Sequence, residues 1–434
     1  MYKKIIIVTA GRINLSDKAN NGLLFRNLFR SWPKDKIGQI YNSGNNHDDG
    51  FFSLYYKLTE KDRRFGKLYE KIYIENTQTN QLTENQFQSK NYFRVVMPYL
   101  KKLLIETGIY ELFFRPKLSS GLKIWLNDFK PDLILAQGYS LTFTELSLLI
   151  KNYTGSQLVF FTTDDWPKYL YNGNLGENRF LSLIPRLRVE NMVKKLLQEV
   201  DIPIAFGYPM QLEYSRRYSK QFYSVFHSDD HKRFETAEPK RLANKDTFSI
   251  VTIGTFNKFR WPLLNDLEQC CEVLNLDGIE AKVFVISDAI DPDGLVAIKQ
   301  MKNVEVRHDP GSDKLPGLLK GADLLLLIEG FDNDYANTIE LSISTKAHLY
   351  MFSKVPILVY SHPTTGISNY AQKYGWAYLV NDRNLEKLTD AIKNLLSNKI
   401  LRENLSTIAY KVAMENHDQK RIEKKLFQIL HLKQ

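Results

Sequence analysis

A glycine followed by two cations marks the first segment of the chain that is able to bind an anion. Gly254 ends an apolar run, and Lys258 and Arg260 follow it just before a predicted helix. A glycine at the end of a strand lets backbone amides approach a phosphate, and the N-terminus of the next helix adds positive potential. The pattern predicts phosphate binding, although the same residue types also occur in ordinary strand-to-helix turns.

A second candidate anion site begins a later helix. Ser344, Thr345 and Lys346 place two hydroxyls and an ammonium group at the predicted helix start. These groups bind phosphates through charge-assisted hydrogen bonds. The alternative is an ordinary helix with Ser344 or Thr345 as its N-cap and Lys346 in water.

The elements that must hold these residues alternate between strand and helix. Apolar runs predict strands in the first half at 5–10, 133–136, 158–162 and 202–206. A second series follows at 248–253, 282–286, 304–307, 324–328, 357–360 and 377–380. This order predicts an α/β fold with two Rossmann-like domains in tandem.

The length of 434 residues exceeds what one hydrophobic core usually organises. We expect a first domain over 1–230 with a helical insertion at about 41–126. A polar, charged stretch then predicts a linker over 231–247. A second domain over 248–415 and a closing helix over 416–434 complete the chain.

The formal charge of +10 favours an anionic partner: nucleic acid, a membrane surface or phosphate-bearing substrates. No zinc-finger spacing or RNA-binding signature occurs, so nucleic acid is not expected. Basic and apolar residues interleave over 92–126. This segment is either a helix on an anionic bilayer or a helix hairpin that packs on its own domain.

The two cysteines, Cys270 and Cys271, are adjacent, which favours a reducing compartment and offers no metal site. The apolar run near the N-terminus is too short for a signal peptide. The patterns of hydrolases, metalloproteases and P-loop NTPases are absent from the sequence. His308 follows a predicted strand and is either structural or near a bound base.

Four patterns occur in a fixed order along nearly the whole chain: KPDLI at 130–134, glycine and two cations at 254–260, LPGLLKGADLL at 315–325 and STKAHLYMFSKVPIL at 344–358. Together they resemble the GT-B glycosyltransferases, in particular the retaining family 4 enzymes of bacterial surface-polysaccharide synthesis. The resemblance implies two Rossmann-like domains that face a central cleft.

In that family the C-terminal domain binds a nucleotide sugar, and cations take the place of a metal at its diphosphate. Fixed cations stabilise the departing diphosphate most in the transition state. Lys346 and Arg260 are therefore expected to be catalytic, together with Asp165 as an acceptor-positioning residue. The donor-binding residues implied by the resemblance are Gly254, Lys258, Arg260, Glu340, Ser344, Thr345 and Lys346.

Two positions depart from the family pattern. Leu349 replaces a glutamate that often binds the ribose, and Lys354 replaces a turn glycine. Glu340, Asp332 or Asp334 could bind the ribose or the sugar instead. Either donor recognition is rearranged or activity is reduced.

On the acceptor side, the resemblance points to two segments of the first domain. Asn21 and Gly22 precede a helix expected near residue 23, where the glycine either admits a phosphate or simply forms a turn. Asp164, Asp165 and Trp166 follow a strand end that faces the expected cleft. Carboxylates and an indole can bind sugar hydroxyls and ring faces.

These features predict a glycosyltransferase that retains the donor's anomeric configuration and uses a nucleotide-diphosphate sugar as co-substrate, without a metal or other cofactor. The expected acceptor is a lipid-linked or growing glycan, with an anionic membrane surface as a further partner. The expected location is the cytoplasm, at the inner face of the membrane. The alternatives are a catalytically silent homologue that serves as a binding or scaffold subunit, and a nucleotide-sugar epimerase.

Overall fold

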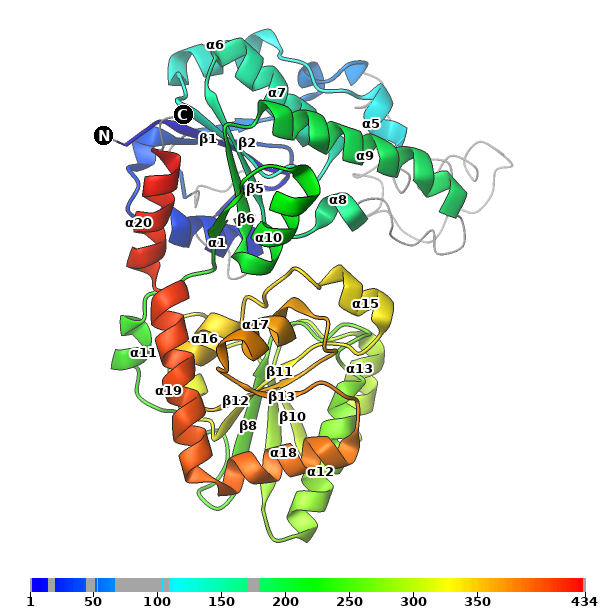
Figure 1. The fold of residues 1–434 in the computed structure, drawn as a ribbon, viewed down its shortest axis with the longest axis vertical. Helices are drawn as coiled ribbons and strands as arrows, with labels where there is room; N and C mark the ends of the chain where they lie inside the picture. Colours follow the sequence, from blue (N-terminus) through cyan, green and yellow to red (C-terminus); the bar gives the residue numbers. More distant parts are fainter. Residues whose placement is uncertain are drawn as a thin grey trace, which may run out of the picture.

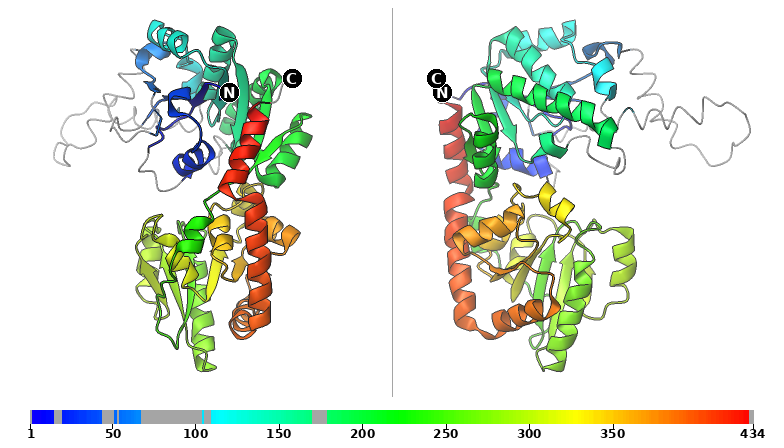
Figure 2. Two further views of the ribbon diagram at one scale, coloured as in Figure 1. Left: turned by 90° about the vertical axis from the view of Figure 1, so that its left-hand side faces the viewer. Right: turned by 45° about the vertical axis from the view of Figure 1, so that its right-hand side comes forward.

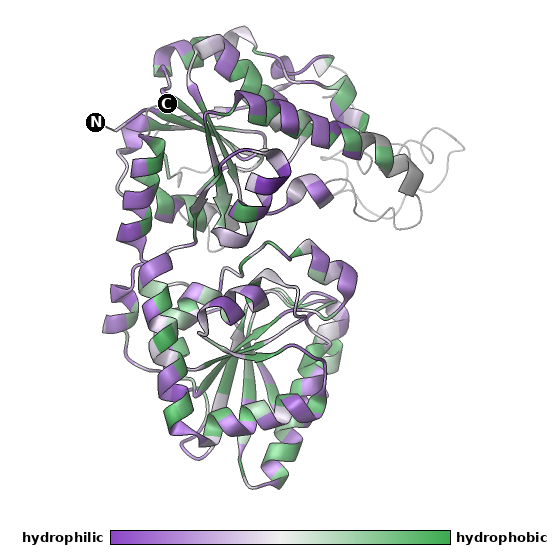
Figure 3. Cartoon of the chain, viewed as in Figure 1, coloured by the Kyte–Doolittle hydropathy of each residue, from purple (hydrophilic) through white to green (hydrophobic). Residues whose placement is uncertain are grey.

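The computed structural model describes residues 2–14, 20–43, 51–52, 54–66, 104, 109–169 and 179–431. Within these residues the chain forms two parallel sheets, one above the other in Figure 1, with helices on both faces of each. Figure 3 shows the sheet interiors as mostly hydrophobic and the outer helix faces as hydrophilic. The predicted α/β fold with two Rossmann-like domains is confirmed.

The first sheet has seven parallel strands in the order β3-β2-β1-β4-β5-β6-β7. Its strands are β1 (Ile5–Val8), β2 (Ile37–Tyr41), β3 (Leu54–Lys57), β4 (Leu133–Ala136), β5 (Gln157–Thr162), β6 (Ile202–Phe206) and β7 (Tyr223–Val225). The accompanying helices are α1 (Asn20–Leu28), α5 (Ile109–Phe113), α6 (Ser120–Phe129), α7 (Leu141–Thr154), α8 (Trp166–Tyr169), α9 (Arg179–Glu199) and α10 (Gly207–Tyr218).

The second sheet has six parallel strands in the order β10-β9-β8-β11-β12-β13. They are β8 (Phe248–Ile253), β9 (Ala281–Ile286), β10 (Val304–Arg307), β11 (Leu324–Ile328), β12 (Ile357–Tyr360) and β13 (Tyr378–Val380). The helices are α12 (Leu263–Leu276), α13 (Pro292–Ile298), α14 (Leu315–Lys320), α15 (Asn333–Thr338), α16 (Ala347–Phe352), α17 (Gly366–Tyr374) and α18 (Leu385–Ser397).

Three strands of the first sheet lie outside the set predicted from sequence: β2, β3 and β7. In β2, Gly38 and Gln39 interrupt the apolar run, but the buried Gln39 amide donates to Thr9 Oγ1 at 2.6 Å and to the Gly11 carbonyl at 2.8 Å. These bonds let a polar residue occupy a central strand, which its type alone does not predict.

The helix predicted near residue 23 begins at Asn20, so the expectation that Asn21 and Gly22 lie in the preceding loop is wrong: both belong to α1. The expected insertion at 41–126 contains β3, α5 and part of α6, while residues 67–103 and 105–108, including the first part of the basic segment at 92–126, lie outside the described residues. A short helix, α11 (Lys232–Thr236), lies within 231–247.

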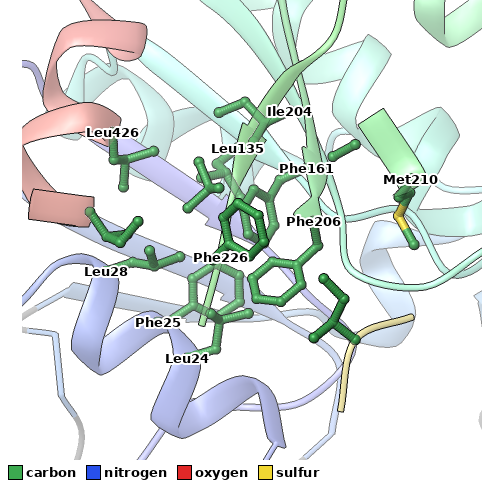
Figure 4. Close-up of a cluster of buried hydrophobic side chains, with 14 of the residues drawn as sticks. Leu24, Phe25, Leu28, Leu135, Phe161, Ile204, Phe206, Met210, Phe226 and Leu426 are labelled. Atoms are coloured by element: carbon green, nitrogen blue, oxygen red, sulfur yellow. The ribbon is translucent and has the colours of Figure 1, made fainter. Parts of the chain in front are cut away.

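The C-terminal helices join the two domains. Helix α19 (Lys399–Asn416) packs on α16 of the second domain, and α20 (Gln419–Leu430) packs on α1 and β7 of the first. Figure 2 shows these two helices running along one side of both domains. Figure 4 shows Leu426 of α20 in the first core, beside Leu28 of α1 and among side chains from β4, β5 and β6.

The two segments that pass between the domains are bonded to each other. The Asp229 amide donates to the His417 carbonyl at 3.1 Å, and the Gln419 amide donates to the Asp229 carbonyl at 3.1 Å. His231 Nδ1 lies 2.7 Å from an oxygen of Asp418. The chain therefore crosses between its domains through one hydrogen-bonded pair of segments.

In the described part of the chain, no helix is both long and apolar enough to cross a membrane.

Candidate functional site

A cleft of about 600 Å³ lies between the two domains. Each sheet reverses its strand order beside its first strand, at β1 and β4 in the first domain and at β8 and β11 in the second. Open α/β sheets bind ligands outside the carboxyl ends of the strands at this point. Gly254, which follows β8, and Glu329, which follows β11, both line the cleft.

Lys346 and Gly254, predicted from separate motifs, are in contact. Gly254 has φ +109°, a conformation that favours glycine, and a Cβ at this position would lie 2.8 Å from the Lys346 ammonium nitrogen. The missing side chain therefore makes room for the lysine at the end of β8. Burial, with a smaller effect from the charge of Arg260, lowers the pKa of Lys346 to about 8.

Tyr350 holds the lysine in this place. Its hydroxyl accepts a hydrogen bond from the Ile253 amide at 2.9 Å and lies 3.4 Å from the Leu326 carbonyl, so it bridges β8 and β11 where their ladder ends. Tyr350 is fully buried on α16, one helical turn after Lys346. Helix α16 is thereby fixed against the carboxyl ends of the two strands.

Arg260 is not a free cation. Its guanidinium makes two hydrogen bonds of 2.7 Å to the buried Glu329 carboxylate, and Tyr335 donates to the same carboxylate at 2.8 Å. Burial opposes the charge of Arg260, but Glu329 and Tyr335 together outweigh the effect of burial, so the pKa of Arg260 is raised. The pair is nearly neutral as a unit, whereas Lys346 makes no ion pair with any described residue. Lys346 thus supplies the uncompensated charge.

The first domain contributes Asp164, Asp165 and Trp166 to the cleft wall. Asp165 is 3% exposed, and both its oxygens accept hydrogen bonds from Arg217, at 2.7 and 2.9 Å. Tyr214 donates a third at 3.0 Å. This carboxylate is occupied by its own domain, so its geometry is that of a structural ion pair.

Asp164 and Trp166 differ in their exposure to the cleft. Asp164 is exposed, accepts from Tyr139 at 2.9 Å, and lies 3.4 Å from Ser342 Oγ across the cleft. Trp166 is buried and stacks on Tyr139 with ring centroids 5.8 Å apart. Asp164 is therefore the carboxylate of this segment that is open to a ligand.

Other predicted residues lie at the edge of the site. Ser344 and Thr345 line the cleft, but the N-cap of α16 is Lys346, without a side-chain capping bond. Lys258 is exposed over the ring of Phe259 and does not line the cleft. Glu340 is exposed and pairs with Lys168 of the first domain at 3.8 Å.

Most of the remaining predicted positions lie outside the cleft. Gly22 is buried within α1 and is not among the cleft residues, and the side chain of Asn21 lies outside the description. His308 is 99% exposed and pairs with Asp288 at 2.9 Å. Leu349 lines the cleft at the expected ribose position. Lys354 keeps a glycine-like φ of +59° and lies over the Tyr410 ring, outside the cleft.

The cleft residues that sequence reasoning missed include Asn27, His227, Ser228, Glu329, Ser342 and His348. Glu329 had a signal, because it directly follows the fully apolar strand at 324–328. His227 and Ser228 had none, since they belong to a segment that passes between domains and reach the cleft only through tertiary structure. In the described residues, no group of three His, Cys, Asp or Glu side chains is placed to hold a metal.

Comparison with known proteins gives two related sequence matches and a large set of similar folds. No protein-family model matches the chain. A UDP-N-acetylglucosamine–N-acetylmuramyl-(pentapeptide) pyrophosphoryl-undecaprenol N-acetylglucosamine transferase from Prochlorococcus marinus is 27% identical over 259 residues, which is 56% of this chain. The match spans 65% of that relative, somewhat less than two thirds of its length.

Two solved structures match nearly end to end. Sucrose-phosphate synthase from Thermosynechococcus elongatus superposes with a TM-score of 0.64 at 12% identity, covering 99% of this chain and 98% of that one. HepE from Anabaena, in complex with UDP and glucose, has a TM-score of 0.59 at 11% identity and 99% coverage of both chains. With its two Rossmann-like domains, the chain has the GT-B fold of these glycosyltransferases.

Proposed function

We propose that this protein is a glycosyltransferase that moves a sugar from a nucleoside-diphosphate donor to a lipid-linked or growing glycan. The observation that carries the proposal is the contact between Lys346 and Gly254. It places a cation that makes no ion pair with any residue of the described chain at the carboxyl end of β8, beside the strand reversal where such sheets bind nucleotides. The relative that uses UDP-N-acetylglucosamine and the fold match crystallised with UDP support UDP as the donor nucleotide.

In the proposed reaction, Lys346 binds the diphosphate and stabilises the charge that grows on it as the bond to the sugar breaks. An ammonium fixed by α16 and Tyr350 needs little reorganisation to do this, which makes it more effective than a mobile surface lysine. Arg260 lines the same cleft and positions the site through Glu329. This division of roles requires no metal, and we propose a metal-independent reaction.

We also propose retention of the donor's anomeric configuration, on the strength of the resemblance to the retaining family. Asp164, exposed and facing Ser342 across the cleft, is placed to orient an acceptor hydroxyl. The acceptor of the curated relative is attached to undecaprenol, which supports a lipid-linked acceptor and action at the cytoplasmic face of a membrane. The net charge of +10 suits an anionic surface there.

The second candidate is a silent homologue that binds ligands without turnover, and Leu349 is the observation that favours it. It lies in the cleft where the family often has a ribose-binding glutamate. An epimerase is disfavoured, because two of the cleft carboxylates, Asp165 and Glu329, are fully engaged by Arg217 and Arg260.

Product analysis separates these functions. The purified protein is incubated with UDP-N-acetylglucosamine or UDP-glucose, with and without the undecaprenol-linked acceptor, and in EDTA. We expect release of UDP that depends on the acceptor and persists in EDTA. We also expect NMR of the product to show a glycosidic linkage that retains the anomeric configuration of the donor. Isomerised donor without acceptor would identify an epimerase, and binding without any product would identify the silent homologue.

A further inference from the structure

Two buried polar atoms at the back of the cleft have no hydrogen-bond partner within the described part of the chain. They are the hydroxyl oxygen of Ser228 and Nδ1 of His348, in side chains that are 2% and 5% exposed. Both residues line the cleft. Leaving a buried polar group unpaired disfavours the folded state, so such groups in native structures call for an explanation. A ligand in the adjoining cleft would provide one.

The imidazole rings beside these atoms are uncharged at neutral pH. The His348 ring stacks between His227 and His417, with centroids 6.0 and 5.7 Å apart and interplanar angles of 11° and 25°. Burial, and to a lesser degree the charge of Arg233, lowers the pKa of His348 to about 3. Burial and His348 likewise lower the pKa of His417 to about 3. The rings are therefore neutral at pH 7, unlike the cationic end of the cleft at Lys346.

This neutral region is built from both domains. His348 lies on α16, and Ser228 lies in the segment that passes between the domains. Asn27 of α1 donates to the Ser228 carbonyl at 2.6 Å and lines the same cleft. His417 Nδ1 lies 2.7 Å from the His227 carbonyl oxygen, and His417 Nε2 lies 3.0 Å from the Tyr370 hydroxyl. These contacts hold the ring of His417 in the stack.

Neutral donors and acceptors match uncharged hydroxyls better than phosphates, because a phosphate buried here would lack a compensating charge. We infer that Ser228 and His348 form a subsite that binds the hydroxyl groups of a sugar ring, separate from the diphosphate site at Lys346. The inference rests on the proposed function and deepens it. Both atoms are covered in the free protein, so binding includes a rotation of these side chains or a shift of the crossing segment.

The test compares sugar binding with nucleotide binding. Ser228→Ala removes the hydroxyl without adding bulk, and His348→Phe keeps a stacking ring but removes both nitrogens. Calorimetry measures the affinity of each variant for UDP and for UDP-N-acetylglucosamine. A second arm adds free N-acetylglucosamine to UDP-saturated protein.

Each variant is expected to bind UDP like the wild type and to bind sugar about threefold to tenfold more weakly. A loss with UDP-N-acetylglucosamine assigns the subsite to the donor sugar, and a loss with the free sugar assigns it to the acceptor. Ser249→Ala is the matched control, because that hydroxyl is also buried and unpaired but lies outside the cleft-lining set. It should leave both arms unchanged.

Melting temperatures show whether the variants fold. If His348→Phe does not fold, Ser228→Ala alone is sufficient for the test. Wild-type sugar affinities in the Ser228→Ala protein, with UDP binding intact, would overturn the subsite and leave the proposed function standing. If the wild type bound neither UDP nor its sugar conjugate, the proposed function would fail, and the subsite with it.

Discussion

Replacing Lys346 with methionine is expected to weaken UDP binding and, at the same time, to stabilise the free protein. The ammonium lies against Gly254 and makes no ion pair within the part of the chain that the structure describes, and burial lowers its pKa to about 8 from an ordinary value of 10.5. Holding it charged at pH 7 therefore costs the folded state on the order of 1–3 kcal/mol. Losing its charged hydrogen bond to a phosphate costs binding about 1.5–3 kcal/mol, or roughly tenfold to over a hundredfold in affinity.

The same pKa gives the binding a pH dependence of known sign. The folded pKa of Lys346 lies below the unfolded value, so the unfolded chain holds more protons between pH 8 and 10.5, and wild-type stability gains from this group as pH rises through that window. The affinity for UDP changes in the opposite direction. It is highest below pH 8 and falls by up to about tenfold per pH unit above it, until the pH reaches the pKa of Lys346 in the complex. The phosphates of UDP are already ionised above pH 8, because their second pKa is about 6.

Calorimetry of UDP binding from pH 6.5 to 9.5, together with thermal unfolding at pH 7, measures both effects. Lys346→Met should bind weakly at every pH, without the decline above pH 8, and should melt at a higher temperature. Lys258→Met is the matched control, because that lysine is exposed and outside the cleft. Equal affinity of Lys346→Met and wild type at pH 7, or a flat wild-type profile, would refute the assignment of the diphosphate to this lysine.

Three further substitutions test the rest of the site. Asp165→Ala removes the buried partner of Arg217, which keeps only Glu213, and should lower the free energy of unfolding by about 2–4 kcal/mol in urea titrations; unchanged stability would show that the pair is not structural. Gly254→Ala, at φ +109°, should displace the neighbouring lysine and abolish UDP binding measured by calorimetry, while wild-type affinity would contradict that contact. Glu329→Gln unpairs Arg260, so it should lower the melting temperature yet tighten UDP binding several-fold, and weaker binding would show that the carboxylate itself holds the nucleotide.

The second domain was the easier half to predict. Four of its six strands, β8, β9, β11 and β12, are mostly buried and mostly apolar runs, and all six lie where the sequence placed them to within one residue. In the first domain, β2 carries Gly38 and Gln39, and its pairing depends on hydrogen bonds from Gln39 that no local pattern reveals. Local patterns identify strands whose own residues demand burial, and they miss strands that tertiary contacts stabilise.

The site residues also fall into two groups, those with a local sequence signature and those that only tertiary contacts bring to the cleft. Gly254 and Lys346 were found because strand ends and helix starts have local signatures, and the structure brings the two together. The bidentate pairing of Arg260 with Glu329 joins residues from two different strand ends, so spacing could not reveal it. His227 and Ser228 reach the cleft only because the chain crosses between domains at that point.

The central claim is that the interdomain cleft binds a nucleotide sugar through its diphosphate. Its most direct test is calorimetric titration of the purified protein with UDP, GDP, ADP and CMP and with their common sugar conjugates. The account predicts saturable binding of one nucleoside diphosphate and its sugar conjugate at one site per chain, lost in Lys346→Met. Binding of none of them by the folded protein, or binding that survives that substitution unchanged, would contradict it.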